Sequence, residues 1–168
     1  MANVQATFRA EITSGRKPHE VLEQMNRRLC SLDRPDRFVS FFCGRLDLDR
    51  HQLSYANAGH LQPMLIRADG RVDRLDRGGL LLGIQEHARY EGEVVPMRPG
   101  DLLILFTDGL VERGGPESLF GEPDLLSVAS RYRNLSAADL VVRILEELHR
   151  LTGSLAEDDI TLMILKAL

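Results

Sequence analysis

The chain has 168 residues, of which 43% are hydrophobic and 27% charged, and its formal net charge is −4. These values are typical of one globular domain with its own core and give no reason to expect a nucleic-acid partner. No apolar stretch approaches the roughly 20 residues of a membrane-spanning helix, and Cys30 and Cys43 lack metal-binding spacing. We therefore expect a single cytoplasmic domain over residues 1–168, with reduced thiols and no membrane partner.

Helical periodicity opens the chain. Apolar residues recur every four positions from Val4 to Ile12, which predicts a helix over residues 1–13. Residues 18–32 form a second predicted helix, because proline is tolerated in a first turn and the apolar residues that follow Pro18 share one face.

Strand patterns fill the middle of the chain. Apolar runs bounded by turn residues predict a largely antiparallel meander with strands over residues 38–48, 53–58, 64–67, 71–75, 90–97 and 101–106. A turn around residues 49–52 joins the first two strands. The run Asp47-x-Asp49-x-His51 lacks the sixth-position glycine and the closing glutamate of a calcium loop, so we do not interpret it as one.

Two helices and a strand complete the predicted elements. A short helix is expected over residues 123–130 and a longer one over 136–151, with Ser136 as N-cap and Asp139 three residues later. The last strand covers residues 160–165. Helices grouped around a largely antiparallel sheet are typical of an α+β layered domain.

Two of the apolar runs have acidic residues at one end. The run that ends at Phe106 stops in Thr107-Asp108-Gly109, and Glu157-Asp158-Asp159 precedes the final strand. A carboxylate at a strand end is held rigidly and still reaches solvent, which suits a hard cation. If the two strands are neighbours, Asp108 and Asp158 can share one Mg²⁺ or Mn²⁺. The alternative is that both are ordinary turn residues, since aspartate is common in turns.

Six short motifs follow one another along nearly the whole chain. They are Leu53-Ser-Tyr-Ala-Asn-Ala-Gly-His60 with Pro63, Gly78-Gly79 with Leu82-Gly83, Arg98-Pro-Gly-Asp101, Phe106-Thr-Asp-Gly-Leu-Val-Glu112, Leu119-Phe-Gly121 and Asp158-Asp-Ile-Thr161. In this order they resemble the bacterial SpoIIE/RsbU-type serine phosphatases, a branch of the metal-dependent protein phosphatase (PPM) family. Each motif is weak alone, and the ordered set carries the resemblance.

The resemblance implies a PPM-type sandwich of two antiparallel β-sheets flanked by helices. It also implies a protein serine/threonine phosphatase in which two Mn²⁺ or Mg²⁺ ions activate a water that attacks the phosphorus. Asp108 and Asp158 then match metal ligands. Asp159, Thr107 and Gly109 match positions that shape the site around them. No protein nucleophile is needed, and we interpret His60 as a structural strand end.

The family's first acidic motif, Asp-Val-(Ser/Ala)-Gly-His-Gly, does not occur in this sequence. We therefore expect the C-terminal portion of the phosphatase domain, lacking its opening strands, with one ion or none and with impaired activity. The resemblance implies a phosphorylated regulatory protein of the STAS (anti-anti-sigma) type as substrate. It also implies an upstream sensor or receiver domain in the intact protein. Open sheet edges favour self-association, for which a homodimer is the simplest form.

Two other interpretations remain open. A catalytically inactive phosphatase fold would bind a phosphoprotein or regulator without hydrolysing it, and the missing first motif favours this. A plain α+β domain would use its acidic residues only in turns. Binding of Mn²⁺ that depends on both Asp108 and Asp158 would distinguish the phosphatase and the inactive phosphatase fold from the plain α+β domain.

Overall fold

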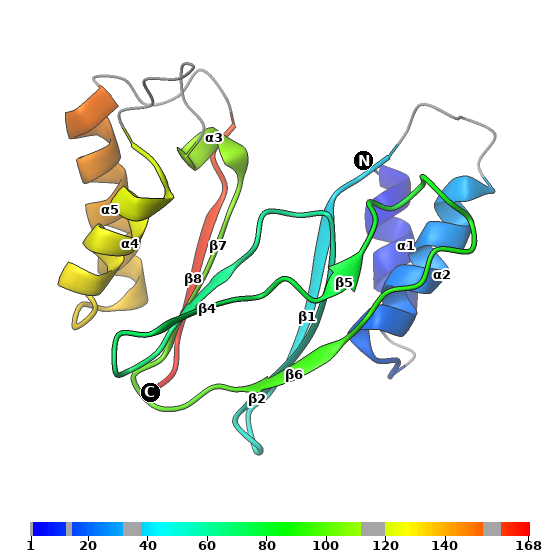
Figure 1. The fold of residues 1–168 in the computed structure, drawn as a ribbon, viewed down its shortest axis with the longest axis horizontal. Helices are drawn as coiled ribbons and strands as arrows, with labels where there is room; N and C mark the ends of the chain where they lie inside the picture. Colours follow the sequence, from blue (N-terminus) through cyan, green and yellow to red (C-terminus); the bar gives the residue numbers. More distant parts are fainter. Residues whose placement is uncertain (1, 13–14, 32–37, 112–119, 153–158) are drawn as a thin grey trace. The chain divides into compact units, whose positions relative to one another are not determined.

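The structure is a computed structural model that describes residues 2–12, 15–31, 38–111, 120–152 and 159–168. Its elements are α1 (Ala2–Ile12), α2 (Pro18–Cys30), β1 (Phe41–Asp47), β2 (Gln52–Ala58), β3 (Met64–Ile66), β4 (Val72–Arg74), β5 (Gly78–Gly79), β6 (Glu93–Pro96), β7 (Leu102–Phe106), α3 (Asp108–Val111), α4 (Glu122–Arg131), α5 (Ala137–Thr152) and β8 (Leu162–Lys166) (Figure 1). The chain divides into two compact units, Met1–Gln62 with Leu75–Met97 and Pro63–Arg74 with Arg98–Leu168. Each unit contains one of two four-stranded sheets.

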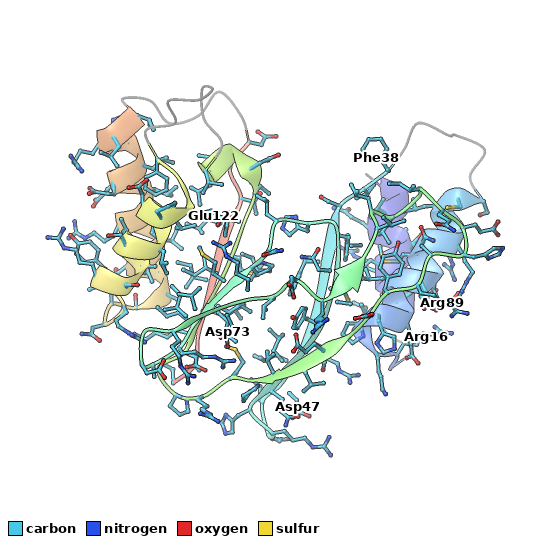
Figure 2. The ribbon with its side chains drawn as sticks, viewed as in Figure 1. Arg16, Phe38, Asp47, Asp73, Arg89 and Glu122 are labelled. Carbon is cyan, nitrogen blue, oxygen red and sulfur yellow. The ribbon has the colours of Figure 1, made fainter. Side chains whose placement is uncertain are left out.

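Strand β2 organises the sheet of the first unit. It pairs antiparallel with β1 along its whole length, from Gln52 opposite Asp47 to Ala58 opposite Phe41. On its other edge, the first half of β2 pairs antiparallel with β6, and its last two residues pair parallel with β5. Because the β1–β2 hairpin closes over residues 47–52, Asp47 lies at its turn, where its carboxylate accepts a hydrogen bond from the Arg50 N–H (3.0 Å) (Figure 2).

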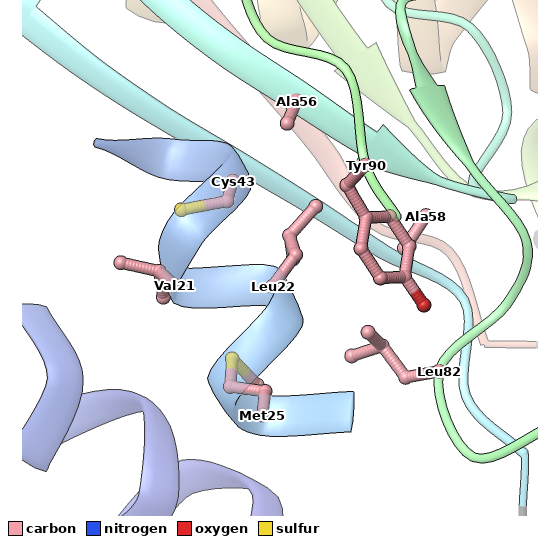
Figure 3. Close-up of a cluster of buried hydrophobic side chains, with 8 residues drawn as sticks. All are labelled: Val21, Leu22, Met25, Cys43, Ala56, Ala58, Leu82 and Tyr90. Carbon is pink, nitrogen blue, oxygen red and sulfur yellow. The ribbon is translucent and has the colours of Figure 1, made fainter. Parts of the chain in front are cut away.

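The core of the first unit lies between α2 and this sheet. Its buried members are Val21, Leu22 and Met25 of α2, Cys43 of β1, Ala56 and Ala58 of β2, Leu82 and Tyr90 (Figure 3). The two alanines are small and leave room for the larger side chains of the helix. Burial raises the pKa of the Cys43 thiol to about 11, as expected for a thiol that packs as an apolar group.

Helix α1 packs in the same unit. The ring of Phe8 lies 5.3 Å from that of Phe41 on β1, and α1 contacts α2. Near the end of α1, the buried carboxylate of Glu11 forms ion pairs with Arg16 (2.6 Å) and Arg28 (2.8 Å). A buried carboxylate needs such partners, because desolvation of an unpaired charge is costly.

The sheet of the second unit has the order β4-β3-β7-β8, with every pair antiparallel. The central strand β7 is the apolar run predicted from sequence and is almost entirely buried. Helix α5 contacts both α4 and β8. It begins as predicted, since the Asp139 N–H donates to the Ser136 hydroxyl (3.1 Å).

The expected fold class is confirmed, because two sheets with mainly antiparallel pairing are combined with five helices in the described residues. The expectation of one meander is wrong: the β3–β4 hairpin and β7 belong to a different sheet from β1, β2 and β6. The first strand is also shorter than predicted, since Val39 forms only an isolated bridge with Leu82. The assignment of residues 1–168 to one domain stays a prediction.

One prediction concerned membranes. Within the described ranges, no helix combines the length and the apolar character needed to cross a bilayer.

Candidate functional site

The two strands with acidic ends are direct neighbours. Phe106, the last residue of β7, faces Leu162, the first residue of β8. The end of one strand therefore lies beside the start of the other, which confirms the condition under which the two acidic motifs were expected to meet.

Asp108 begins the short helix α3, where the sequence predicts a turn. Its side chain is exposed, whereas Leu110 and Val111 of the same helix are buried and hold the helix against the core. The Asp108 Oδ1 atom accepts a hydrogen bond from the Gly109 N–H (2.9 Å). None of the ion pairs among the described residues includes Asp108, whose surface is exposed.

Thr107 connects this turn to the start of β8. Its N–H donates to the Thr161 carbonyl (3.1 Å), and its hydroxyl oxygen accepts from the Thr161 N–H (2.9 Å). The hydroxyl also donates to the Asp159 carbonyl over a longer distance of 3.4 Å. These contacts agree with the predicted role of Thr107 in shaping the turn.

The second acidic motif is described only in part. Asp158 of this motif lies outside the described residues, and so does Glu112 of the Thr-Asp-Gly motif. Asp159 is exposed and leads directly towards β8. In the described part of the chain, no group of three or more His, Cys, Asp or Glu side chains is close enough to hold a metal ion. The assignment of Asp108 and Asp158 as ligands therefore remains a prediction.

Carboxylate chemistry is nevertheless suited to a hard cation at this junction. Asp108 offers an exposed oxygen, and its Oδ1 is oriented by the Gly109 amide. Mg²⁺ and Mn²⁺ prefer such oxygen donors and are bound through one or two carboxylates together with water and substrate oxygens. The exposed carboxylate of Asp108 therefore has the donor chemistry that a divalent ion requires.

His60 belongs to a structural turn. The buried side chain of Asn57 accepts from the His60 N–H (2.8 Å) and donates to the His60 carbonyl (3.0 Å) and to the Leu75 carbonyl (3.3 Å). Gly59, between them, has a φ of 68°. The motif therefore builds the turn that follows β2, which agrees with the interpretation of His60 as a strand end.

The paired glycines allow a close approach of two backbones. A Cβ on Gly78 would lie 1.6 Å from the Asn57 carbonyl oxygen, and one on Gly79 would lie 2.6 Å from the Arg89 carbonyl oxygen. Only glycine fits where β5 pairs parallel with β2. This motif too is part of the scaffold.

Asp101 of the Arg-Pro-Gly-Asp motif is buried, with 1% of its surface exposed. It accepts hydrogen bonds from the Ala68 N–H (2.9 Å), the Arg98 N–H (3.0 Å) and the Arg67 guanidinium (3.0 Å). Burial acts to lower the pKa of Arg67, but the hydrogen bonds that its guanidinium donates to Asp73 and Asp101 outweigh burial and raise that pKa. The motif therefore closes the turn before β7. Its buried aspartate has a structural role, unlike the role expected of the exposed Asp108.

Sequence reasoning missed Asn26. This buried residue of α2 accepts from the Gly83 N–H (2.8 Å) and donates to the carbonyls of Gln85 (2.7 Å) and Glu86 (3.1 Å). A polar residue next to Met25 on an otherwise apolar helix face was the available signal. Such a residue is retained inside a core only when its hydrogen bonds are satisfied.

Known proteins resemble this chain in sequence and in fold. The phosphoserine phosphatase RsbU of Bacillus subtilis is 29% identical over 154 residues, which are 91% of this chain and 46% of that protein. The chain thus spans less than half of that relative's length.

Solved structures extend the likeness. The SiaA-PP2C domain of Pseudomonas aeruginosa matches with a TM-score of 0.82 at 20% identity, over 97% of this chain and 67% of that one. RsbX, crystallised in complex with magnesium, matches with a TM-score of 0.67 at 20% identity, over 96% of this chain and 71% of that one. At this identity the two structures show the fold alone. The sequence model of the family described as Stage II sporulation protein E (SpoIIE) matches residues 1–168, and the chain belongs to the SpoIIE family.

Proposed function

We propose that this chain is a metal-dependent protein serine/threonine phosphatase domain. Membership of the SpoIIE family and the likeness to a phosphoserine phosphatase support the activity. The observation that carries the proposal is the pairing of β7 with β8, which sets the exposed Asp108 beside the strand that Asp158 and Asp159 precede in sequence.

In this proposal Asp108 and Asp158 hold Mn²⁺ or Mg²⁺. The bound ion would supply an activated water and would neutralise the charge of the phosphoryl group. Asp108 binds through its carboxylate, while the Gly109 N–H orients that carboxylate. Thr107 holds the turn against β8, and Asp159 belongs to the segment that leads into that strand.

The proposed substrate is a regulatory protein of the STAS type that carries phosphoserine or phosphothreonine. A sensor or receiver domain upstream in the whole protein, a cytoplasmic location and a homodimer belong to the same proposal. The upstream domain rests on the resemblance of the six ordered motifs, the location on composition and the two isolated cysteines, and the homodimer on the expected open sheet edges.

We expect low turnover from the 168 residues alone. The two acidic motifs present supply carboxylates for one ion, and a single ion lowers the pKa of water less than a pair does. An inactive phosphatase fold that only binds its partner is the second candidate, and the absence of the Asp-Val-(Ser/Ala)-Gly-His-Gly motif favours it.

Calorimetric titration with Mn²⁺ tests the proposal, together with hydrolysis of a phosphoserine peptide. Asp108→Asn and Asp158→Asn should each weaken Mn²⁺ binding about 10-fold or more, because each removes a charged ligand. The matched control is Asp69→Asn, which changes an exposed aspartate in the β3–β4 turn of the same unit.

The outcomes separate the candidates. Mn²⁺ binding that is unchanged in both aspartate variants would reject the metal site. Mn²⁺ binding with no measurable hydrolysis would favour the inactive module. Turnover equal to that of an intact homologue would reject the expected impairment.

A further inference from the structure

Thr107 is the residue at which β7 leaves its sheet. In a regular antiparallel pair, two facing residues of the hydrogen-bonded kind exchange both N–H···O=C bonds. The Thr107 N–H makes the first of these bonds, to the Thr161 carbonyl (3.1 Å). The Thr107 carbonyl does not make the second, because it accepts from the Leu110 N–H (3.0 Å) in the first turn of α3.

The Thr107 side chain takes the place of that carbonyl. Its hydroxyl oxygen accepts from the Thr161 N–H at 2.9 Å, a full-strength hydrogen bond. The hydroxyl proton points to the Asp159 carbonyl at 3.4 Å, which is a weaker contact. The two strands therefore gain one more hydrogen bond through a side chain, while the backbone of Thr107 already turns into the helix that begins with Asp108.

We propose that the Thr107 hydroxyl is a positioning group that holds the start of β8 in register with the turn carrying Asp108. The proposal rests on the proposed role of Asp108 in binding a divalent ion. Thr107 itself does not touch the ion. It acts by holding the Asp108 turn against the start of β8, through its hydrogen bonds to the Thr161 N–H and the Asp159 carbonyl.

Few side chains can make both hydrogen bonds at position 107. A hydroxyl can accept from one amide and donate to a carbonyl at the same time, which valine, of nearly the same shape, cannot do. Serine keeps both functions. Groups that orient metal ligands without binding the metal typically change affinity by about 10–100-fold when removed.

Two measurements on the 168-residue chain test the proposal. The first is amide hydrogen exchange at Thr161, which reports the hydrogen bond without any metal. The second is calorimetric Mn²⁺ affinity. Thr107→Val should speed exchange of the Thr161 amide and weaken Mn²⁺ binding about 10-fold. Thr107→Ser should restore both.

A matched control removes another threonine hydroxyl from the same unit. The Thr152 hydroxyl donates to the Leu148 carbonyl in α5 (2.9 Å), so Thr152→Val loses a hydrogen bond in which neither β7 nor β8 takes part. It should leave the Thr161 exchange rate and the Mn²⁺ affinity unchanged. Weaker Mn²⁺ binding in this control would overturn the proposal, because any lost hydroxyl would then have the same effect.

The remaining outcomes are distinct. If Thr107→Val binds Mn²⁺ as tightly as the wild type while Asp108→Asn does not, the positioning role is wrong and the proposed function stands. If Asp108→Asn also binds Mn²⁺ normally, the proposed function fails and the positioning role fails with it. Slow Thr161 exchange retained in Thr107→Val would overturn the hydrogen bond itself.

Discussion

The motif around Asn57 in the first unit and the Thr-Asp-Gly motif in the second belong to the same ordered set, yet their side chains have different surroundings. Asn57 is 4% exposed and uses its whole amide to hold the turn that ends at His60. Asp108 is exposed, and among the described residues its carboxylate accepts a hydrogen bond from the N–H of the next residue, Gly109. The comparison separates motif residues that specify a backbone path from one whose carboxylate is available for a ligand.

Hydrogen-bond accounting explains the difference. A buried polar side chain must satisfy its donors and acceptors within the protein, so it is fixed and its replacement is costly. An exposed carboxylate is already solvated and exchanges water for a cation with little penalty. Among the residues of these ordered motifs, burial therefore distinguishes structural residues from candidate ligand residues better than residue type does.

The largest effect is expected at the glycine pair. Gly78→Ala should destabilise the chain by about 4 kcal/mol or more, because such values follow from steric conflict that the backbone cannot relieve. Its Cβ would lie 1.6 Å from the Asn57 carbonyl oxygen. Denaturant unfolding measures the change. The control Gly70→Ala meets nothing within 4 Å and has only its φ of 89° to penalise it, so a loss of about 1–2 kcal/mol is expected there. Equal losses of stability in the two variants would show that the close contact of Gly78 with Asn57 is not the cause.

A smaller effect is expected at the buried carboxylate of the second unit. Asp101→Asn replaces an acceptor with a donor facing the Arg98 N–H and the Arg67 guanidinium, and the expected loss is about 3 kcal/mol. Asp73→Asn is the matched control, since Asp73 binds the same guanidinium with a side chain that is 49% exposed, and it should cost less than about 1 kcal/mol. A control as damaging as Asp101→Asn would show that burial does not decide the difference.

The smallest effect on stability is expected at Asp108. Asp108→Asn should change the free energy of unfolding by no more than about 0.5 kcal/mol, as is usual for an exposed side chain. The same variant should lose most of the Mn²⁺ affinity. The comparison between the two regions breaks down if Asp108→Asn unfolds the chain as readily as Asp101→Asn does. Thermal unfolding without metal is the measurement that decides this.

Secondary structure was largely predictable from the sequence. The apolar stripes of α2 and α5, the N-cap at Ser136 and the buried run of β7 are local features, and each was expected within a few residues of its observed bounds. Local periodicity and capping act between residues close in the chain, so the sequence alone displays them. The two strands of the β3–β4 hairpin were predicted in the same way, over residues 64–67 and 71–75.

The pairing of strands was not predictable in that way. Nothing local indicates that β3 pairs with β7, or that the two residues of β5 pair parallel with β2. Those choices depend on which apolar faces are buried together, and this depends on contacts between residues far apart in sequence. Helix α3 was missed for the same reason, because buried Leu110 and Val111 stabilise a four-residue helix that is too short to form alone.

For the candidate site, the amino-acid sequence is enough to identify the residue types: two aspartates at strand ends, within an ordered set of motifs that identify the family. Only the folded chain shows that β7 and β8 are neighbours and that Thr107 joins them through its side chain. The same is true of the structural roles of Asn57, Gly78 and Asp101. The physical reason is that burial and hydrogen-bond partners are properties of the folded chain, whereas charge and spacing are already present in the unfolded one.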